Sequence, residues 1–289
     1  MEIELPEIFS YELTLSFLKR SPREILHRIE EDAVLKVLSI KNEPILFKIC
    51  NGENLKIDFL NSNPTEEIKE QVAHYVREWF DLDTDLNPFY RLARKDKLLA
   101  DLVKKFNGYR IIGQPDLFES LVWAVLGQQI NLAFAYTLKQ RFVETFGASV
   151  SYQEKKYFLF PVPEDVAQLT DNDLLPLQFS RQKSNYVKLI GEAFASNSIS
   201  KEKLGKLSFD DAKTELMKIK GIGNWTANYA LMKTFRYPNA FPLEDAGLHN
   251  AIKNLKLMKK KPTLNQVKNI FKKYKGWEAY ATLYLWKSL

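Results

Sequence analysis

The feature that most restricts how this chain can fold is a pair of glycines, Gly221 and Gly223, between two stretches of helical pattern. Before them, the segment FDDAKTELMKIK predicts a helix, and Ser208 and Asp211 fit a capping box at its N-terminus. After them, NWTANYALMKTF predicts a second helix over residues 224–235. Glycine tolerates positive φ, and its missing side chain lets a ligand approach the backbone closely. The sequence therefore predicts two helices joined by a tight hairpin.

The start of the second helix predicts a place for an anion. Because the helix begins directly after the turn, its first N–H groups have no partners within the helix, and its dipole adds partial positive charge there. Anions bind at such helix ends. The alternative is a helical hairpin whose glycines serve tight packing alone, and the spacing by itself slightly favours that alternative.

Length and composition bound the remaining possibilities. The chain has 289 residues, more than the ~100–200 of a usual single domain, so two domains are expected. Hydrophobic residues make up 45% and charged residues 27%, as in ordinary globular proteins. No apolar run approaches the ~20 residues needed to cross a bilayer, and the acidic start MEIELPEIFS is unlike a signal peptide. A cytoplasmic protein with no membrane partner is expected.

Residue types that ligate transition metals are few and scattered. The single cysteine, Cys50, excludes an internal disulfide, a cysteine-ligated zinc site and a four-cysteine iron–sulfur cluster. The three histidines, His27, His74 and His249, are too far apart in the sequence to suggest a metal site. We therefore expect no metal.

Positive charge is concentrated near the end of the chain. Between Lys253 and Lys287 there are ten lysines and one acidic residue, Glu278, a net charge of +9. Since the whole chain carries +6, the rest sums to −3. Such a segment favours a polyanionic partner, because lysines near phosphates release condensed counterions. A solvated helix face with no partner is an equal alternative on charge alone.

The first part of the chain predicts a small α+β domain with an antiparallel sheet. In SPREILHRI, Ser21, Pro22 and Glu24 carry three signals of a helix start. The segment AVLKVLSI predicts a strand, and PILFKICNGENLKIDFL predicts two strands joined around Asn51 and Gly52.

A helix and a linker close this first domain. Thr65 can cap a helix in NPTEEIKEQVAHYVREWF, whose apolar residues fall on one face, and the polar segment DLDTDLNP, residues 81–88, predicts a linker. We therefore expect an α+β domain over residues 1–85 and a mainly helical domain over residues 86–289. Early in the second domain, PDLFESLVWAVLGQQINLAFAYTLKQRFVETFG predicts two helices with a break near Gly127.

Three segments of the second domain share an order and spacing with a known family. LVWAVLGQQIN comes first, KGIGN follows, and FPLEDAGLHNAI places Asp245 22 residues after Gly223. Together they resemble the helix-hairpin-helix superfamily of DNA glycosylases, which have two helical lobes. The resemblance covers about residues 87–289, and the layout with an α+β domain in front is most similar to bacterial 3-methyladenine DNA glycosylase II, the alkylated-base type.

The resemblance implies a partner and a place for it. The partner is double-stranded DNA containing damaged bases, bound by a monomer in the cytoplasm at the nucleoid. No cofactor is implied, although a monovalent cation can occupy such a hairpin. The hairpin residues that would hold a DNA phosphate are Lys220, Gly221, Ile222, Gly223 and Asn224.

Asp245 is the residue that the resemblance makes catalytic. Cleavage of an N-glycosidic bond builds positive charge on the sugar, so one fixed carboxylate beside the sugar can stabilise the transition state and orient water. An alternative role for an Asp in LEDAGL is the N-cap of a helix through His249 and Ile252, and both roles can hold together. Glu244, one residue earlier, is the second candidate.

The residue after GIGN bears on the type of reaction. Relatives that also cut the strand carry a lysine there, which forms a Schiff base with the sugar. This chain has Trp225, so an intact strand with an abasic site is the expected product. Trp225 and Tyr229 lie one helical turn apart, and the resemblance places both in the base pocket together with Trp286. Lys287 stands where well-known relatives commonly have an aromatic residue, and core packing is the alternative for each ring.

Two glutamines complete the predicted site. An enzyme that reaches this bond must extrude the nucleotide and fill the gap. Gln129 matches the wedge position of the family, where some relatives have leucine, and Gln128 lies beside it. The alternative is that both glutamines simply cap the helix break at Gly127.

The sequence thus predicts a monofunctional glycosylase for alkylated purines such as 3-methyladenine and 7-methylguanine, acting in base excision repair by base flipping. Two other classes remain as alternatives. An oxidised-base glycosylase with lyase activity is disfavoured by Trp225, and a non-catalytic DNA-binding module is disfavoured by Asp245 together with the aromatic residues.

Overall fold

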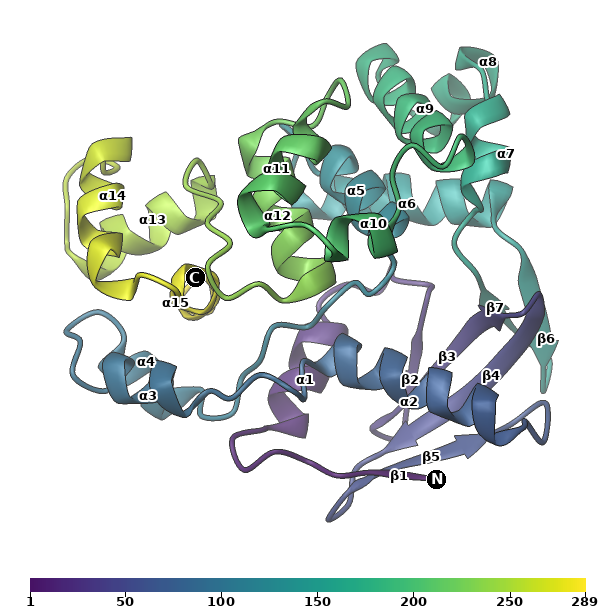
Figure 1. Ribbon diagram of the computed structural model, residues 1–289, viewed down its shortest axis with the longest axis horizontal. Coiled ribbons are helices and arrows are strands. Elements are labelled where there is room, and N and C mark those ends of the chain that lie inside the picture. Colours follow the sequence, from purple (N-terminus) through teal and green to yellow (C-terminus); the bar gives the residue numbers. More distant parts are fainter.

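A computed structural model describes residues 1–289, and it places an antiparallel sheet beneath two groups of helices (Figure 1). The five strands run in the spatial order β1-β5-β4-β3-β2. Their bounds are β1 (Glu2–Ile3), β2 (Arg28–Glu30), β3 (Ala33–Ile40), β4 (Glu43–Cys50) and β5 (Leu55–Phe59). The three strands predicted from the apolar runs are therefore confirmed, including the connection of β4 to β5 through Asn51 and Gly52.

The two faces of this sheet are buried by different partners. Alternate residues of β3 point to opposite faces, as the pleat requires. Val34 packs with the helix α2 (Glu66–Phe80), whereas Leu35 and Val37 pack on the far face. The helix α2 is the one predicted to follow Thr65, and its apolar face covers the sheet.

The predicted helix at SPREILHRI is wrong. The helix lies earlier, as α1 (Tyr11–Leu18) with Ser10 as its N-cap, and residues 21–27 form turns that lead into β2. Glu24 does not reach back to close a capping box. One of its carboxylate oxygens accepts the N–H of Leu26, and the other binds Lys139 of the helical part. A buried long-range ion pair has overridden the local helix signals.

The segment between the sheet and the helices is packed rather than free. Asp81 ends α2 in the left-handed conformation, with φ of 54°. The Asp81 side chain accepts a hydrogen bond from Tyr280, and Arg110 donates to the Asp81 carbonyl oxygen. Asp81, Leu82 and Leu86 are all buried. The polar composition of residues 81–88 predicted a connection but did not reveal its burial.

The helices form two lobes, each with its own apolar core. One core gathers residues of α5, α6, α9, α11 and α12, and the other gathers residues of α3, α4, α13, α14 and α15. The first lobe comprises α5 (Leu117–Leu126), α6 (Leu132–Phe146), α7 (Pro163–Gln168), α8 (Asp171–Leu174), η1 (Leu175–Leu177), α9 (Arg181–Ala195), α10 (Lys201–Gly205), α11 (Phe209–Met217) and α12 (Asn224–Phe235). The second comprises α3 (Asn87–Ala93), α4 (Ala100–Lys105), α13 (Ala246–Leu255), α14 (Leu264–Phe271), η2 (Lys272–Tyr274) and α15 (Glu278–Trp286).

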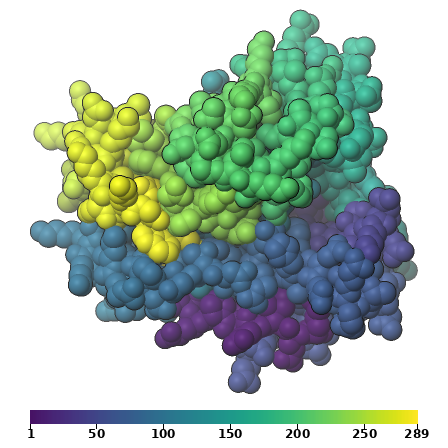
Figure 2. Space-filling view, in the orientation of Figure 1, coloured from purple at the N-terminus to yellow at the C-terminus, as the bar shows by residue number.

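The predicted fold class, two helical lobes preceded by a small α+β unit with an antiparallel sheet, is confirmed. The break near Gly127 and the hairpin between α11 and α12 are also found. In the space-filling view the green and yellow helices of the two lobes lie above the blue part of the chain, which includes α2, α3 and α4, and the purple N-terminal elements lie beneath it (Figure 2). None of the helices combines the length and apolar content needed to span a membrane.

One element of the helical part was not predicted. The strands β6 (Ser149–Tyr152) and β7 (Lys155–Phe158) form a second, two-stranded antiparallel sheet. Tyr157 on β7 packs with Leu35, Val37 and Leu46, so this hairpin covers the far face of the first sheet.

Candidate active site

Asp245 lies between the two helical lobes, at the N-cap of α13. Its Oδ1 atom accepts the backbone N–H of Leu248 at 2.7 Å and the indole N–H of Trp286 at 2.7 Å. Its Oδ2 atom accepts the indole N–H of Trp225 at 3.0 Å. All three donors are neutral, and the carboxylate takes part in no ion pair. The N-cap role is therefore confirmed, and the same carboxylate contacts two tryptophans, so the negative charge of Asp245 is held in place without being cancelled.

The two tryptophans reach Asp245 from different lobes. Trp225 is the second residue of α12, directly after the glycine hairpin, and Trp286 is the last residue of α15. Both are only partly buried, so their rings line an accessible site. Trp225 stacks on Tyr229, one turn along α12, with ring centroids 5.2 Å apart and planes 20° apart. The structure thus brings together the predicted acid and all three predicted aromatic residues.

The aromatic surface continues beyond the predicted residues. Trp123 on α5 donates its indole N–H to the Tyr229 hydroxyl at 3.1 Å, and burial raises the pKa of Tyr229. Trp123 also packs against Tyr136 on α6, with ring centroids 4.8 Å apart. Neither residue was predicted, because helical periodicity places both on buried faces. Their side chains nevertheless support the ring that faces the site.

The hairpin glycines have different structural roles. Gly221 has φ of +99°, and a Cβ there would lie 2.3 Å from the ring of Tyr186. Gly223 is extended, with φ of −91° and ψ of −179°, and a Cβ there would have no neighbour within 4 Å. The left-handed position is therefore Gly221, not Gly223. Ile222 between them is buried, and Lys220 is exposed.

The start of α12 is open to a ligand. Gly223 is its N-cap and supplies no side chain to bind the first N–H groups of the helix. Asn224 directs its amide to Glu244, donating to both carboxylate oxygens at 2.9 and 3.0 Å. Glu244 therefore points to the hairpin, whereas Asp245 points to the tryptophans. The geometry separates the two acids that the sequence left as candidates.

The two predicted glutamines also differ. The Gln128 amide donates to the carbonyl oxygen of Gly221 at 3.0 Å and to the Thr226 hydroxyl at 3.1 Å, so it ties the α5–α6 turn to the hairpin. Gln129 is exposed, with φ of 57° and no side-chain partner. Lys183 fixes the same turn by donating to the carbonyl oxygen of Gln128 at 2.7 Å, and burial lowers its pKa to about 8.

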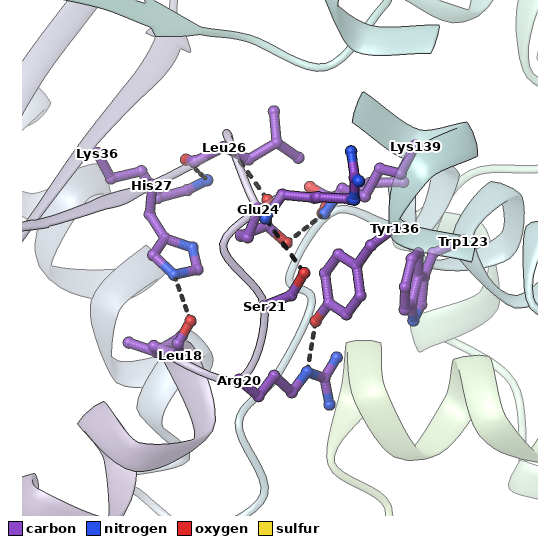
Figure 3. A network of polar contacts seen from close by, with 12 residues as sticks. Leu18, Arg20, Ser21, Glu24, Leu26, His27, Lys36, Trp123, Tyr136 and Lys139 are labelled. Atoms are coloured by element: carbon purple, nitrogen blue, oxygen red, sulfur yellow. Dashed lines mark hydrogen bonds and ion pairs between the residues drawn. The ribbon is translucent and has the colours of Figure 1, made fainter. Parts of the chain in front are cut away.

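The N-terminal helix and the residues just after it contact both helical lobes. Beyond α1, Arg20 donates its Nε–H to the Tyr136 hydroxyl (Figure 3). Its guanidinium carbon lies 3.9 Å from the ring centroid of Phe17. Lys287 extends over Tyr109 and reaches the hydroxyl of Ser16 at 3.3 Å. The position that is commonly aromatic in relatives thus contacts α1 instead.

A buried ionic cluster joins the N-terminal part to α6. Lys139, one helical turn from Tyr136 on α6, binds Glu24 at 2.9 Å (Figure 3). It also binds Glu119 at 3.3 Å. Burial alone would raise the pKa of Glu24, but the Lys139 ammonium lowers it to about 2. Burial also lowers the pKa of His27 to about 4, against a partial opposing effect of Glu24. A cavity of about 50 Å³ lies among these residues.

The basic segment belongs to the second helical lobe, from α13 to the end of α15. Most of the lysines between Lys253 and Lys287 are exposed, and only Lys273 is in an ion pair, with Asp96. The lysines therefore remain available to an anion. No group of three or more histidine, cysteine, aspartate and glutamate side chains is placed to hold a metal ion.

Comparison with known proteins identifies the family. The model of the HhH-GPD superfamily of base excision DNA repair proteins matches residues 122–276. This chain belongs to that superfamily. Residues 15–121 match a second model, the N-terminal domain of 8-oxoguanine DNA glycosylase.

Three relatives show how much of this chain is similar to known proteins in sequence or structure. A DNA-3-methyladenine glycosylase of Bacillus subtilis is 47% identical over 99% of this chain and 96% of its own length. The structure of a 3-methyladenine DNA glycosylase from Archaeoglobus fulgidus superposes with a TM-score of 0.85, covering 99% of this chain and 97% of that one at 23% identity. That of Schizosaccharomyces pombe Mag1 with abasic DNA gives 0.59, at 27% identity over 68% of this chain and 93% of that one.

Proposed function

We propose that this protein is a monofunctional DNA glycosylase that hydrolyses the N-glycosidic bond of alkylated purines in duplex DNA, as a step of base excision repair. One observation carries the proposal: the Asp245 carboxylate is held by the N–H groups of Trp225, Trp286 and Leu248, with no cation beside it. The HhH-GPD membership and the likeness to the Bacillus subtilis enzyme support it. We expect it to act as a monomer at the nucleoid.

The reaction follows from the charge on Asp245. As the bond between the sugar and the base breaks, positive charge develops on the sugar, and a nearby carboxylate stabilises it. This stabilisation is strongest when the carboxylate keeps its charge and is fixed in position. Neutral N–H donors meet both conditions. The same carboxylate can orient the attacking water. Asp245 is therefore the proposed catalytic residue, in preference to Glu244, which is bound to Asn224.

The product is expected to be an intact strand with an abasic site. A lyase needs an amine that attacks the sugar and forms a Schiff base. The residue after the hairpin, at the start of α12, is Trp225, whose indole nitrogen donates to Asp245 and has no free lone pair. This disfavours the oxidised-base glycosylase with lyase activity. The stacked pair of Trp225 and Tyr229 favours electron-poor alkylated purines through cation–π attraction of roughly 0.5–2 kcal/mol.

DNA binding is proposed to use two further features. The open N-terminus of α12 would hold a backbone phosphate on its N–H groups. Gln129, exposed at the α5–α6 turn, would fill the gap left by the flipped nucleotide, and Gln128 would support it by holding that turn on the hairpin. The exposed lysines of α13 to α15 would add sequence-independent attraction.

The direct test is to incubate the protein with duplex DNA treated with a methylating agent. Released bases are identified by chromatography, and strand integrity is measured before and after alkali. We expect 3-methyladenine and 7-methylguanine to be released, with breaks only after alkali. Release of oxidised bases with strand cleavage before alkali would support the lyase instead. Tight binding without release of any base would support the non-catalytic module.

The hairpin proposal has its own test in a pair of glycine variants. Gly223→Ala adds a methyl group that meets no protein atom, so folding stability should be unchanged. If a phosphate approaches here, DNA affinity should fall by about tenfold, because the backbone is no longer accessible. Gly221→Ala is the matched control: it strains a left-handed position and strikes Tyr186, so its melting temperature should fall. Wild-type affinity in Gly223→Ala would contradict the phosphate role.

A further inference from the structure

Arg20 is a charged side chain whose position neither the fold nor the proposed reaction explains. It lies just after α1, in the N-terminal part, yet its Nε–H donates to the hydroxyl of Tyr136 on α6. Its guanidinium lies over the ring of Phe17 and forms no ion pair. The residue is exposed, and its two terminal amino groups have no protein partner. Four N–H donors are therefore free at this point.

Aromatic contacts link Arg20 to the proposed catalytic residue. Tyr136 packs on Trp123, and Trp123 donates to the hydroxyl of Tyr229. Tyr229 stacks on Trp225, which binds Asp245. The charge of Arg20 is close enough to Tyr229 to act against the rise in the pKa of that hydroxyl. Arg20 thus stands at one end of this series of aromatic contacts and Asp245 at the other.

We propose that Arg20 is a specificity-determining residue that donates hydrogen bonds to the edge of the flipped purine and selects for neutral damaged purines. This inference rests on the proposed glycosylase function. A guanidinium only donates and is always charged. It therefore suits a purine edge with oxygen and nitrogen acceptors, such as that of hypoxanthine. It repels a purine that carries a positive charge, such as 7-methylguanine.

The charge on the leaving base also favours neutral purines as substrates. When the bond between C1′ and N9 breaks, its electron pair goes to the base. A neutral purine leaves as an anion and takes up the proton that the attacking water loses, so a cation beside it stabilises the transition state. A 7-methylated purine already carries a positive charge and leaves neutral, and the water proton goes to solvent. Arg20 can assist only the first departure.

The two ends of the pocket then favour different substrates. The rings of Trp225 and Tyr229 attract cationic purines by cation–π attraction, and Arg20 disfavours them. Neutral purines gain less from the rings but gain charge-assisted hydrogen bonds from Arg20. A pocket built in this way accepts both classes, and Arg20 sets the ratio between them.

The experiment compares two duplexes of one sequence, one with a single hypoxanthine and one with a single 7-methylguanine. For wild type, Arg20→Gln and Arg20→Lys, kcat/KM is measured on both, and thermal melting reports folding. Lys19→Gln is the matched control, because Lys19 is the neighbouring cation but pairs with the exposed Asp32. Arg20→Gln should lower hypoxanthine release by about tenfold to a hundredfold, the effect of losing charge-assisted hydrogen bonds. It should leave 7-methylguanine release unchanged or raised.

Arg20→Lys keeps the charge but not the planar fork, so we expect it to fall between wild type and Arg20→Gln on hypoxanthine. Equal losses on both duplexes would show that Arg20 only supports Tyr136, and would overturn the proposal. So would unchanged release from both, or a wild-type protein that releases 7-methylguanine but no hypoxanthine. A wild-type protein that releases neither base, and no 3-methyladenine from methylated DNA, would instead overturn the proposed function itself, independently of Arg20.

Discussion

Two carboxylates in this molecule are held in opposite ways. Asp245, between the helical lobes, receives two indole N–H groups and one backbone N–H, with no cation. Glu24, between the sheet domain and α6, is buried against the ammonium of Lys139. Both groups are anchored on distant parts of the chain. They differ in whether their charge is cancelled.

The difference shows what each position requires. The attraction within a buried ion pair offsets part of the hydration free energy that its two charges have lost. Removing one partner is therefore strongly destabilising. The Glu24–Lys139 pair can therefore hold two parts of a protein together, but it presents little net charge to a third group. Three neutral donors fix a carboxylate equally well and leave its field intact. Of the two, only Asp245 keeps the uncancelled charge that its proposed catalytic role requires.

The largest expected effect comes from removing the charge of Asp245. Asp245→Asn changes volume little, but it should slow base release by a factor of hundreds or more, since a transition-state contact of about 3–4 kcal/mol is lost. DNA binding, measured by fluorescence anisotropy, should remain nearly intact. Glu24→Gln is the control for loss of a carboxylate elsewhere and should retain turnover in the folded protein. Near-normal release by Asp245→Asn would move the catalytic role to Glu244.

The second prediction removes the cation that Glu24 has and Asp245 lacks. Lys139→Met leaves Glu24 and Glu119 without their ion-pair partner, so the free energy of unfolding should fall by about 3 kcal/mol. Urea denaturation measures this loss. Lys155→Met breaks an exposed pair with Glu30 and should cost less than about 1 kcal/mol. Equal stability losses in the two variants would mean that the buried pair does not stabilise the contact between the N-terminal part and α6.

Sequence reasoning anticipated one of these carboxylates and misread the other. Asp245 could be singled out from the sequence because the residues around it match the family pattern and signal the start of a helix. Glu24 fitted a local capping box, and its partner lies 115 residues away, so no local pattern could reveal the pair. The same limit hid Trp123, Tyr136 and the β6–β7 hairpin, whose roles depend on long-range packing.

The sequence therefore predicted those elements that depend on local periodicity and residue spacing. The strands β3 to β5, the helix α2 and the two helices flanking Gly221 and Gly223 are all of this kind. The spacing also named the hairpin glycines but not their difference. Only the path of the backbone past Tyr186 shows that Gly221 needs the left-handed conformation.

The third prediction tests the buried ionic cluster around Glu24 by changing the pH. His27 has its pKa lowered to about 4 by burial, from an ordinary value of 6.5. Between pH 6.5 and 4 the unfolded chain therefore takes up a proton that the folded protein does not, and the free energy of unfolding should fall by about 2 kcal/mol across this window. His27→Gln should remove most of that fall, as measured by urea denaturation at each pH.

The loss at still lower pH has a different origin and is the internal control. Glu24 has its pKa lowered to about 2, so its contribution is present above pH 4.5 and disappears as pH falls toward 2. His27→Gln should retain this second loss. A variant whose stability still falls between pH 6.5 and 4 as in wild type would show that His27 is not the group responsible.

The smallest expected effect separates the two possible roles of Trp286. If Trp286 serves only as an aromatic wall of the base pocket, Trp286→Phe should retain activity or raise KM. If its N–H holds Asp245, the same variant keeps the ring but loses the 2.7 Å hydrogen bond, and the carboxylate is fixed by two donors instead of three. Such a loss is worth about 1 kcal/mol, so kcat should fall by about fivefold while KM and melting temperature change little. Because no cation is removed, the effect should stay far below that of Lys139→Met on stability. An unchanged kcat would show that two neutral donors suffice to hold a catalytic carboxylate.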